Sequence, residues 1–480
     1  MERPSVDDYF GDWKQREALV QEMIPVIGRL FSQRNVGIFI YGRPLHNRSV
    51  TFIMKSHRFV RQVERNEMSE FETHLTLMAM AKLDLWHAQI DLGKLTVRYM
   101  EHRDSQRDSA LSVDDFVRSE MGYLDGLKKK PIEKSQDVVL YGFGRIGRLM
   151  ARLLVERTST GEVMRLRAIV VRPGGPGDLE KRANLFTSDS VHGAFQGTLR
   201  VDEENCSLIA NGNVIKVIYA NSPEEIDYRE HDIDDALIID NTGKWRDEEG
   251  LSLHLKSKGA SKVILTAPGK GALKTIVYGI NDHQMSADDK IITAASCTTN
   301  AIAPVLKVVN DRFGIEHGHV ETVHAYTNDQ RLADVPHSDC RRSRAAAENV
   351  IPTTTGAARA VGVVLPELNG KLDGIAMRVP VPDGSVVDFN VQLNKDVTVD
   401  QINEAVREAS INGSLKGILE YSTLPVVSSD IIGNSHSSIF DAPFTRVIGG
   451  NYVKTLNWYD NEWGYSNRVV DLVSLLGSIG

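Results

Sequence analysis

Cysteine is scarce in this chain, with only Cys206, Cys297 and Cys340 among 480 residues. Three widely spaced thiols do not make a disulfide framework, so a reducing compartment, and hence the cytoplasm, is expected. Long apolar runs are also lacking, because no stretch approaches the roughly 18 residues that a membrane-spanning helix needs. The amino-terminal stretch MERPSVDDYFGDWKQRE has no apolar core, so no signal peptide is expected either.

An excess of positive charge is the third absence. The formal net charge is −8, which argues against a general nucleic-acid binder and leaves room only for a local basic patch. Charged residues make up 25% and hydrophobic residues 41%, the composition of an ordinary globular protein with a sizeable core. The length predicts about two to four domains. No membrane partner and no metal ligand set are expected.

The first 130 residues carry mainly helical signals. The segment LVQEMIPVIGRLF has apolar residues at helical spacing, and a second helical stretch is predicted from Met68 to Met100, with Leu75 and Trp86 on its apolar face. Between them, VGIFIYGRPL fits a short strand or an ordered loop. The lysine-rich segment LDGLKKKPIEKSQD follows and is predicted to be a linker. A small, mainly helical N-terminal domain is therefore expected.

Beyond the linker the pattern alternates between strands and helices. DVVLYGFG, RLRAIVVRP, DALIIDNTG and SKVILTAPG are short, apolar and β-branched, whereas RLMARLLVER and EEGLSLHLKSKG are helical. This rhythm predicts a doubly wound parallel sheet. Past residue 300 the strands alternate as in an antiparallel sheet, accompanied by the helix VDQINEAVREAS, and the chain closes with the helix GYSNRVVDLVSLLGSI.

The segment GFGRIG follows a strand and opens a helix, which is the context in which G-x-G-x-x-G indicates a dinucleotide site. Gly142 allows the tight turn, Gly144 lets backbone amides approach a pyrophosphate, and Gly147 allows close packing of helix on strand. The alternative is an ordinary glycine turn.

The second strand of this unit ends in Arg172, where an acidic residue would bind the ribose 2′-hydroxyl of NAD. A guanidinium pairs with a 2′-phosphate, whereas a carboxylate repels it. The sequence therefore favours NADP or the use of both cofactors. The alternative is that Arg172 points into solvent and the site takes NAD.

Cys297 lies in the polar segment ASCTTN, an unusual setting for a thiol that only fills a core. A nucleophilic thiol needs a base, and His324 in TVHAYTNDQR is the candidate. An inert cysteine and a structural histidine remain the alternatives, because spacing alone does not prove contact. The hydroxyls and guanidinium groups downstream suit phosphate, or else a solvated or subunit-bridging surface; they belong to Arg341, Arg342, Arg344, Thr353–Thr355 and Arg378, with Gly356 at an expected helix N-terminus.

From residue 136 to its end the chain resembles the phosphorylating glyceraldehyde-3-phosphate dehydrogenase family. The resemblance rests on GFGRIGR, SDSVHGAF, ASCTTN, TVHAYTNDQRLADVPHSDCRRSRAAAENVIPTTTGAARAVG, LPELNGKLDGIAMRVP and WYDNEWGYSNRV. It implies a Rossmann domain over 136–296, a mixed α/β catalytic domain over 297–458 and a C-terminal helix over 459–480 that returns to the first domain. It also implies a homotetramer in which an "S-loop", residues 325–349, runs along the neighbouring cofactor site.

The resemblance also assigns roles. Cys297 matches the family's nucleophile and His324 its base. Thr327, Asp329 and Arg378 match the residues that hold the substrate's phosphate. The positions for the attacking inorganic phosphate match Ser296, Thr298, Arg342, Thr355 and Gly356. The cofactor positions are Gly142, Gly144, Arg145, Ile146, Gly147, Arg172, Thr242, Thr266, Asn461 and Tyr465, with Asn461 orienting the nicotinamide amide.

The implied reaction is the reversible, phosphate-dependent oxidation of glyceraldehyde 3-phosphate to 1,3-bisphosphoglycerate, with NAD or NADP as hydride acceptor. Two alternatives stay open: an erythrose-4-phosphate dehydrogenase, and a non-catalytic relative that binds or regulates. Arg172 departs from NAD-binding members of the family, whereas Pro336 in the S-loop departs from strongly NADP-preferring ones. The first 130 residues lie outside the resemblance and are interpreted as an oligomerisation module, a regulatory flap, a partner-binding arm, or packing without a catalytic role.

Overall fold

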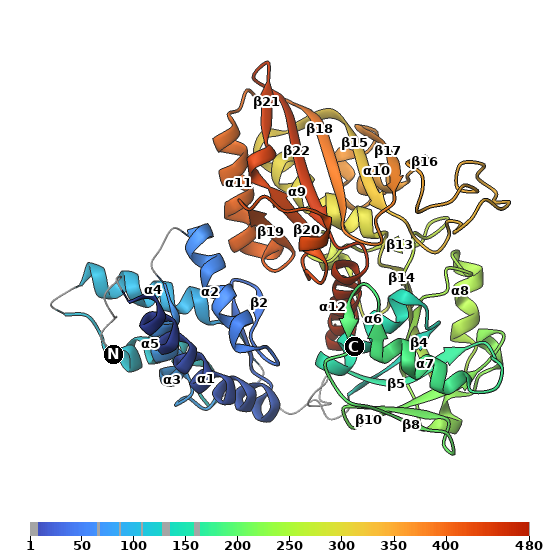
Figure 1. The fold of residues 1–480 in the computed structure, drawn as a ribbon, viewed down its shortest axis with the longest axis horizontal. Coiled ribbons are helices and arrows are strands. Elements are labelled where there is room, and N and C mark those ends of the chain that lie inside the picture. The colour runs from blue at the N-terminus through green and yellow to red at the C-terminus, as the bar shows by residue number, and fades with distance from the viewer. Residues whose placement is uncertain are drawn as a thin grey trace. The chain divides into compact units, whose positions relative to one another are not determined.

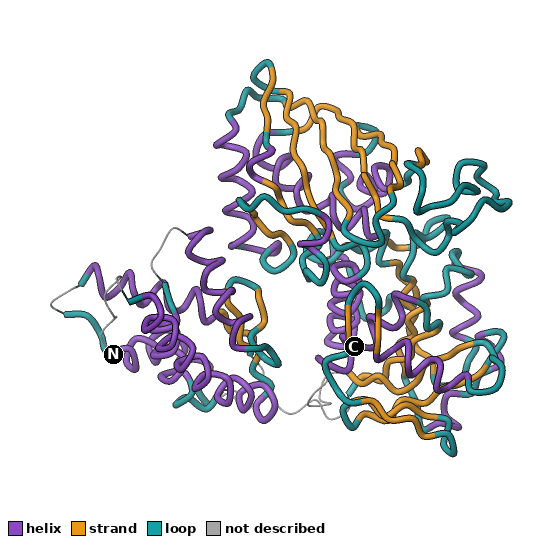
Figure 2. The backbone as a smooth tube through the Cα atoms, viewed as in Figure 1, coloured by secondary structure: helices purple, strands orange, loops and turns teal. Residues whose placement is uncertain are grey.

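The structure is a computed structural model that describes residues 8–64, 68–85, 88–106, 109–126, 135–157 and 164–479. The chain divides into two compact units, 1–133 and 134–480. Most of the predicted lysine-rich linker, residues 127–134, lies outside the described residues. Figures 1 and 2 show the elements of each unit. Among the described residues, no helix combines the length and the apolar character needed to cross a membrane.

The N-terminal unit is mainly helical, as predicted. The helix α1 runs unbroken through Pro25 and buries Leu19, Met23 and Ile27, the residues at helical spacing. A three-stranded sheet in the order β2-β1-β3 completes the unit, so VGIFIYGRPL contains strands. The elements are α1 (Tyr9–Arg34), β1 (Gly37–Ile40), β2 (Arg43–Pro44), α2 (Val50–Glu64), α3 (Glu70–Met80), β3 (Gln89–Asp91), α4 (Leu92–Ser105) and α5 (Val113–Met121).

The prediction of one helix from Met68 to Met100 is wrong. The helix α3 ends at Met80, and β3 pairs in parallel with β1 before α4 begins. The side chain of Asp91 accepts a hydrogen bond from the Lys94 amide and starts α4. Leu75 is 48% exposed instead of lying on an apolar face, and Trp86 is outside the described residues. Pairing with a distant strand therefore overrides the local apolar pattern.

The second unit begins with a nine-stranded sheet whose order is β13-β14-β12-β11-β4-β5-β10-β9-β8. Its centre is parallel, with β5 on one side of β4 and β11 on the other. The strand order reverses at β4, so the expected ligand crevice lies at the carboxyl ends of β4 and β11. The strands are β4 (Gln136–Tyr141), β5 (Met164–Val171), β8 (Leu199–Asp202), β9 (Ser207–Ala210), β10 (Asn213–Tyr219), β11 (Ala236–Asp240), β12 (Ala260–Leu265), β13 (Lys274–Thr275) and β14 (Ile291–Thr293).

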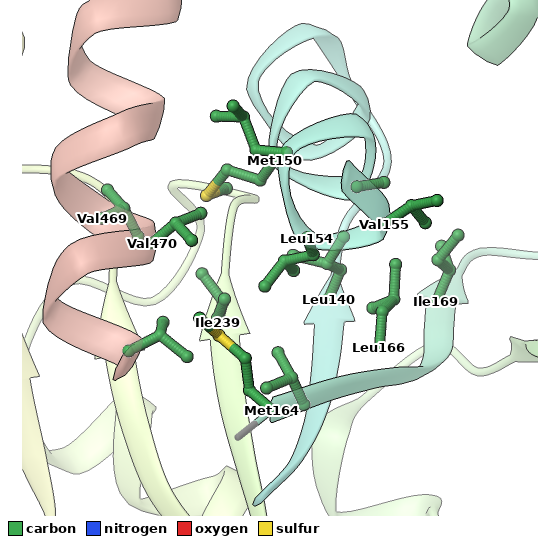
Figure 3. Packing of buried hydrophobic residues seen from close by; sticks show 14 of the residues in the cluster. Leu140, Met150, Leu154, Val155, Met164, Leu166, Ile169, Ile239, Val469 and Val470 are labelled. Atoms are coloured by element: carbon green, nitrogen blue, oxygen red, sulfur yellow. The ribbon is translucent and has the colours of Figure 1, made fainter. Parts of the chain in front are cut away.

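One face of this sheet is covered by α6 (Arg145–Arg157) together with α12 (Trp463–Ile479), which follows the second sheet in the chain. Met150 and Leu154 of α6 lie near Val469 and Val470 of α12, as Figure 3 shows. The helix α8 (Glu248–Leu255) contributes Leu251 to a second cluster of buried residues on this sheet. The remaining elements of this part are α7 (Asp178–Thr187), β6 (Ser188–Asp189) and β7 (Gly193–Ala194).

The following sheet is mixed, which differs from the antiparallel pattern expected past residue 300. Its order is β16-β17-β15-β18-β22-β20-β19, with β21 pairing β22. The pairs β15–β17 and β19–β20 are parallel. The elements are α9 (Cys297–Phe313), β15 (Ile315–Ala325), β16 (Ile351–Thr354), α10 (Ala357–Val364), β17 (Leu372–Val379), β18 (Ser385–Leu393), α11 (Val399–Ile411), β19 (Leu419–Ser422), β20 (Ser438–Asp441), β21 (Arg446–Ile448) and β22 (Tyr452–Tyr459).

The register of this sheet decides which side chains meet. In the parallel pair β15–β17, His324 stands opposite Arg378. In the antiparallel pair β18–β22, Ser385 stands opposite Tyr459. The helices α9, α10 and α11 bury their apolar sides against the sheet, so these strand ends are held in fixed positions. The predicted fold class, a Rossmann sheet plus a mixed α/β domain behind a mainly helical N-terminal part, is confirmed.

Candidate active site

Cys297 is the first residue of α9. The chain reaches it through Ala295, whose φ of 59° is left-handed and therefore strained for a residue with a Cβ. Ser296 is the N-cap: its hydroxyl accepts a hydrogen bond from the Thr299 amide at 3.0 Å. The thiol thus sits at a helix N-terminus, where free amides and the helix dipole favour a thiolate.

The thiol and the expected base are in contact. The Sγ atom of Cys297 lies 3.5 Å from Nε2 of His324. On the other side of the ring, Nδ1 lies 2.6 Å from the carbonyl oxygen of Ala325, to which it donates. When Nδ1 carries the ring proton for this bond, the lone pair of Nε2 faces the sulfur. The neutral imidazole is therefore oriented to take the thiol proton.

Arg378 lies beside this pair because of the β15–β17 register. Its Nη1 donates to the Ala325 carbonyl at 2.9 Å and to Oγ1 of Thr327 at 3.3 Å, and it stands 2.9 Å from Nδ1 of His324. Burial, followed by the charge of Arg378, lowers the pKa of His324 to about 3. Burial raises the pKa of the Cys297 thiol. Burial thus opposes charge on both groups, and the neutral imidazole is available to act as the base for the thiol.

Tyr459 contacts the residue next to the nucleophile. The sequence analysis did not identify it as a site residue. Its hydroxyl is 3.0 Å from Oγ1 of Thr298 and 2.9 Å from Oγ1 of Thr322. Its ring stands edge-on to the ring of His324, with centroids 5.8 Å apart. Tyr459 is in the matched segment WYDNEWGYSNRV, but only the strand pairing reveals its contact with the residue next to Cys297.

The residues expected to hold phosphate lie in two groups joined by Asp329. Thr327 donates its hydroxyl proton to Asp329 and receives a hydrogen bond from Arg378. On the other side of Asp329, Arg342 forms an ion pair with the carboxylate at 2.6 Å and donates from Nε to Oγ1 of Thr353 at 3.0 Å. One carboxylate therefore spans the two expected phosphate positions.

The last two phosphate residues precede α10. Gly356 is the N-cap of this helix, and the hydroxyl of Thr355 accepts a hydrogen bond from the Ala357 amide at 3.2 Å. The helix N-terminus predicted from the sequence is therefore present. The free backbone amides at this helix N-terminus are donors that can bind an anion.

The glycine turn has the geometry that a pyrophosphate requires. Gly142 has a φ of 101°, a conformation that side chains oppose. A Cβ on Gly147 would stand 2.5 Å from the Gly142 carbonyl oxygen, so only glycine lets α6 approach the turn. Across the crevice, Asp240 accepts hydrogen bonds from the amide and hydroxyl of Thr242, each at 2.7 Å. The residues present fit a dinucleotide at this crevice.

Several predicted cofactor residues have partners inside the protein. Arg145 is ion-paired with Glu462 and Asp189. Oγ1 of Thr266 donates to the Asp240 carbonyl at 3.0 Å, and the Tyr465 hydroxyl donates to the Ala295 carbonyl at 3.0 Å. Two further residues complete the set: Ile146 packs against the apolar core, and Asn461 accepts a hydrogen bond from Ser385.

Arg172 is exposed directly after β5. Its carbonyl oxygen accepts a hydrogen bond from Arg182 at 3.4 Å. The following carboxylate, that of Asp178, is already engaged by Arg182 at 2.6 Å and by the Tyr219 hydroxyl at 3.0 Å. The end of β5 thus carries an exposed arginine, and the carboxylate of Asp178 that follows it is already engaged.

A glycine turn at the reversal point of a parallel sheet, followed by a mixed sheet with a thiol–imidazole contact, defines an NAD(P)-dependent dehydrogenase. Comparison with known families agrees. Residues 136–248 match the model of the glyceraldehyde 3-phosphate dehydrogenase NAD binding domain, and residues 296–461 match that of its C-terminal domain. The chain belongs to the glyceraldehyde-3-phosphate dehydrogenase family and is an oxidoreductase that binds NAD(P).

Individual relatives show how far the similarity extends. A glyceraldehyde-3-phosphate dehydrogenase of Thermotoga maritima is 49% identical over 340 residues, 71% of this chain and 98% of the relative. One of Borreliella burgdorferi is 47% identical over 344 residues, 71% of this chain and 99% of the relative. A glyceraldehyde-3-phosphate dehydrogenase-like protein of Pseudomonas aeruginosa is 50% identical over 460 residues, 95% of this chain and 98% of the relative. This last match extends into the N-terminal unit, which the family models leave out.

Proposed function

We propose that the protein oxidises glyceraldehyde 3-phosphate to 1,3-bisphosphoglycerate, with NAD(P) as hydride acceptor and inorganic phosphate as acyl acceptor. The observation that carries this proposal is the 3.5 Å contact between Cys297 and His324. Cationic and hydroxyl groups flank that contact on both sides. An aldehyde that carries a phosphate and a second, attacking phosphate are the ligands for which such a site is built.

In the first step, Nε2 of His324 takes the thiol proton while the sulfur of Cys297 attacks the aldehyde carbon. The proton then passes to the former carbonyl oxygen, which gives a hemithioacetal. Bound NAD(P) supplies a hydride acceptor. Loss of hydride from carbon and return of the hydroxyl proton to His324 leave a thioester on Cys297. The amides at the start of α9 are the donors available to the oxygen on which charge develops.

The second half of the reaction needs a bound anion. Phosphate held by Arg342 and the amides before α10 attacks the thioester carbon and expels the thiolate, which recovers the proton from His324. The product is an acyl phosphate, so the oxidation energy is conserved instead of being lost by hydrolysis. Arg342 is engaged by Asp329 and Thr353, so phosphate competes with these partners.

The direct test uses glyceraldehyde 3-phosphate with NAD or NADP in turn, with phosphate, with arsenate, or with neither. Reduced nicotinamide is expected to accumulate over many turnovers only when phosphate or arsenate is present. Turnover without either anion would identify a hydrolytic enzyme of the erythrose-4-phosphate dehydrogenase kind. No reduction with either cofactor would favour a non-catalytic relative, and slow alkylation of Cys297 compared with Cys206 and Cys340 would support that outcome.

Replacing Arg342 by alanine is expected to raise the KM for phosphate by about 10–100-fold, because charge-assisted hydrogen bonds to an anion contribute about 1.5–3 kcal/mol each. The KM for the aldehyde should change less, since Arg378 and Thr327 remain in place. Initial rates at varied phosphate and fixed aldehyde measure this effect. Arg344, which pairs with Asp334 at an exposed position, supplies the matched control R344A. Equal effects of the two variants would contradict the assignment.

We further propose a homotetramer in the cytoplasm. Leu332 and Val335 of the S-loop are 89% and 47% exposed, and apolar side chains of this size are suited to burial against a neighbouring subunit.

All three cysteines are free, which suits a reducing compartment. The exposed Arg172 supports NADP or dual cofactor use, and the ratio of kcat/KM for the two cofactors measures it.

Removal of residues 1–133 is expected to leave kcat and both KM values within about twofold, because every residue of the candidate site lies in the unit 134–480. Sedimentation of the full and shortened chains should show four subunits in each case. A loss of tetramers would identify the N-terminal unit as an oligomerisation module. Changed kinetic constants at unchanged mass would identify it as a regulatory element.

A further inference from the structure

A buried histidine outside the reacting groups links the two domains of the second unit. His192 lies in the turn between β6 and β7, and its Nε2 is 3.1 Å from Oδ2 of Asp383 and 3.0 Å from Oδ2 of Asp460. The side chains of His192, Asp383 and Asp460 are 3%, 0% and 0% exposed. We propose that protonated His192 is a positioning residue, which holds these two carboxylates together and thereby fixes the amide of Asn461 for the nicotinamide. The inference rests on the proposed function for the role of Asn461.

The path from His192 to the cofactor position is short. Asp383 is two residues from Ser385, whose hydroxyl donates to Oδ1 of Asn461 at 2.7 Å and accepts from the Ala325 amide at 3.0 Å. Asp460 directly precedes Asn461. With Oδ1 of Asn461 engaged, only its NH₂ group remains to donate to a carboxamide oxygen. The same hydroxyl of Ser385 reaches the backbone next to the expected base, His324.

Asp460 also fixes its own loop. Its Oδ1 accepts hydrogen bonds from the amides of Glu462 at 2.9 Å and Trp463 at 2.6 Å, at the start of α12. Its Oδ2 accepts from the Gly433 amide at 2.7 Å. A shift of the Asp460 carboxylate would therefore move the backbone that carries Asn461. The pairing of β18 with β22 already brings this loop next to Asp383, and His192 adds an ionic contact to both carboxylates.

The charges around His192 require its proton. On its own turn, Asp189 lies 3.7 Å from Nδ1; from the start of α12, Glu462 lies 3.8 Å from the same atom. From α6, Arg145 pairs with Asp189 and Glu462, and Arg148 stands 3.7 Å from Asp189. The Trp463 ring stacks on the imidazole at 5.9 Å. Four carboxylates therefore face two guanidinium groups, and an imidazolium supplies the third positive charge.

The titration of the cluster agrees with this geometry. Burial opposes the charge, yet hydrogen bonds to Asp383 and Asp460 raise the pKa of His192 to about 10. Burial and the charge of Asp460 raise the pKa of Asp383 to about 7. Because the folded-state pKa of His192 is raised, the imidazole keeps its proton at neutral pH and loses it as pH rises through about 10. The raised pKa of Asp383 means that this carboxylate is lost as pH falls below neutral. The nitrogen of His192 and the carboxylate oxygens of Asp383 and Asp460 lie within 4.8 Å of one another, close enough to suggest a metal site. The N···O distances are those of hydrogen bonds, however, so a proton on His192 occupies the space in which a metal ion would bind.

The test measures cofactor binding to the full chain by fluorescence titration with NADH and with NADPH, without aldehyde or phosphate. His192→Gln is expected to weaken binding of the better-bound cofactor by about tenfold. This is the effect of losing about one well-oriented hydrogen bond between Asn461 and the cofactor. Alkylation of Cys297 in the absence of cofactor should stay within about twofold. The exposed His283 provides the matched control H283Q, which should leave both quantities unchanged. Because no substrate is present, the outcome is independent of whether the proposed reaction is correct.

Two further variants separate positioning from bulk packing. His192→Gln leaves two buried carboxylates face to face, so adding Asp383→Asn should restore most of the lost affinity, whereas a merely structural defect would be worsened. His192→Lys keeps the positive charge. The ratio of its cofactor affinity at pH 10.5 to its affinity at pH 8 should therefore exceed the same ratio for the wild-type protein. The proposal is overturned if H192Q binds both cofactors within twofold of the unchanged chain. It is also overturned if D383N gives no recovery, or if H192K and the unchanged chain lose affinity alike between pH 8 and 10.5.

Discussion

Replacement of Cys297 by serine is expected to reduce turnover by about 10⁴-fold or more. The sulfur is the only nucleophile at the start of α9 that contacts the imidazole of His324. A serine hydroxyl has a far higher pKa than a thiol, and an oxygen ester would not conserve the oxidation energy as a thioester does. The measurement is the rate of reduced nicotinamide formation under saturating aldehyde, phosphate and cofactor.

The matched control for this loss is Cys340→Ser, because Cys340 is exposed in the S-loop and contacts no reacting group among the described contacts. It should retain the full rate. Cofactor affinity should be unaffected in both variants, which shows that the fold is intact. A C297S chain that retains more than about one hundredth of the rate would refute covalent catalysis at this position.

Replacement of His324 by asparagine is expected to lower kcat/KM by about 10²–10⁴-fold near neutral pH, the usual contribution of a general base. Burial and Arg378 lower the pKa of His324 to about 3, so the imidazole is neutral and able to accept a proton across the ordinary pH range. The thiol, whose pKa burial raises, depends on this base. In the variant the rate should climb with pH as thiolate forms without help, so the deficit should shrink toward alkaline pH.

The control for this second variant is His319→Asn, an exposed histidine on the same strand, β15. It should show the pH profile of the unchanged chain. A deficit of H324N that stays constant from pH 6 to 10 would contradict the role of base and would favour a purely electrostatic role. The free energy of unfolding provides a separate check. Because His324 is buried in its neutral form, the protein should lose stability as pH falls from the ordinary pKa of histidine toward the folded value of about 3.

The elements that depend on local pattern were predictable. The alternation of apolar strands with amphipathic helices over 136–265 follows from side-chain periodicity, and the glycines of the turn have physical reasons at single positions. The prediction of a helix N-terminus at Gly356 also rests on local pattern and is confirmed.

What depends on pairing between distant segments was not predictable from one sequence. The parallel register of β15 and β17 places Arg378 beside His324, although they are 54 residues apart in the chain. Tyr459 reaches Thr298 across 161 residues. The same cause explains the wrong helix over 68–100, where β3 forms only because β1 is available to pair with it. Periodicity describes one element at a time, whereas registers are set by the whole sheet.

The helix α12 has a consequence for biosynthesis. Val469, Val470 and Val473 complete the apolar core of the cofactor-binding sheet, yet in chain order they follow all the strands of the second sheet, down to β22. The nascent cofactor domain therefore exposes one flank of its core until α12 has also left the ribosomal exit tunnel. A stop codon immediately before α12 should yield a chain that chaperones retain, even though every glycine of the dinucleotide turn has been synthesised.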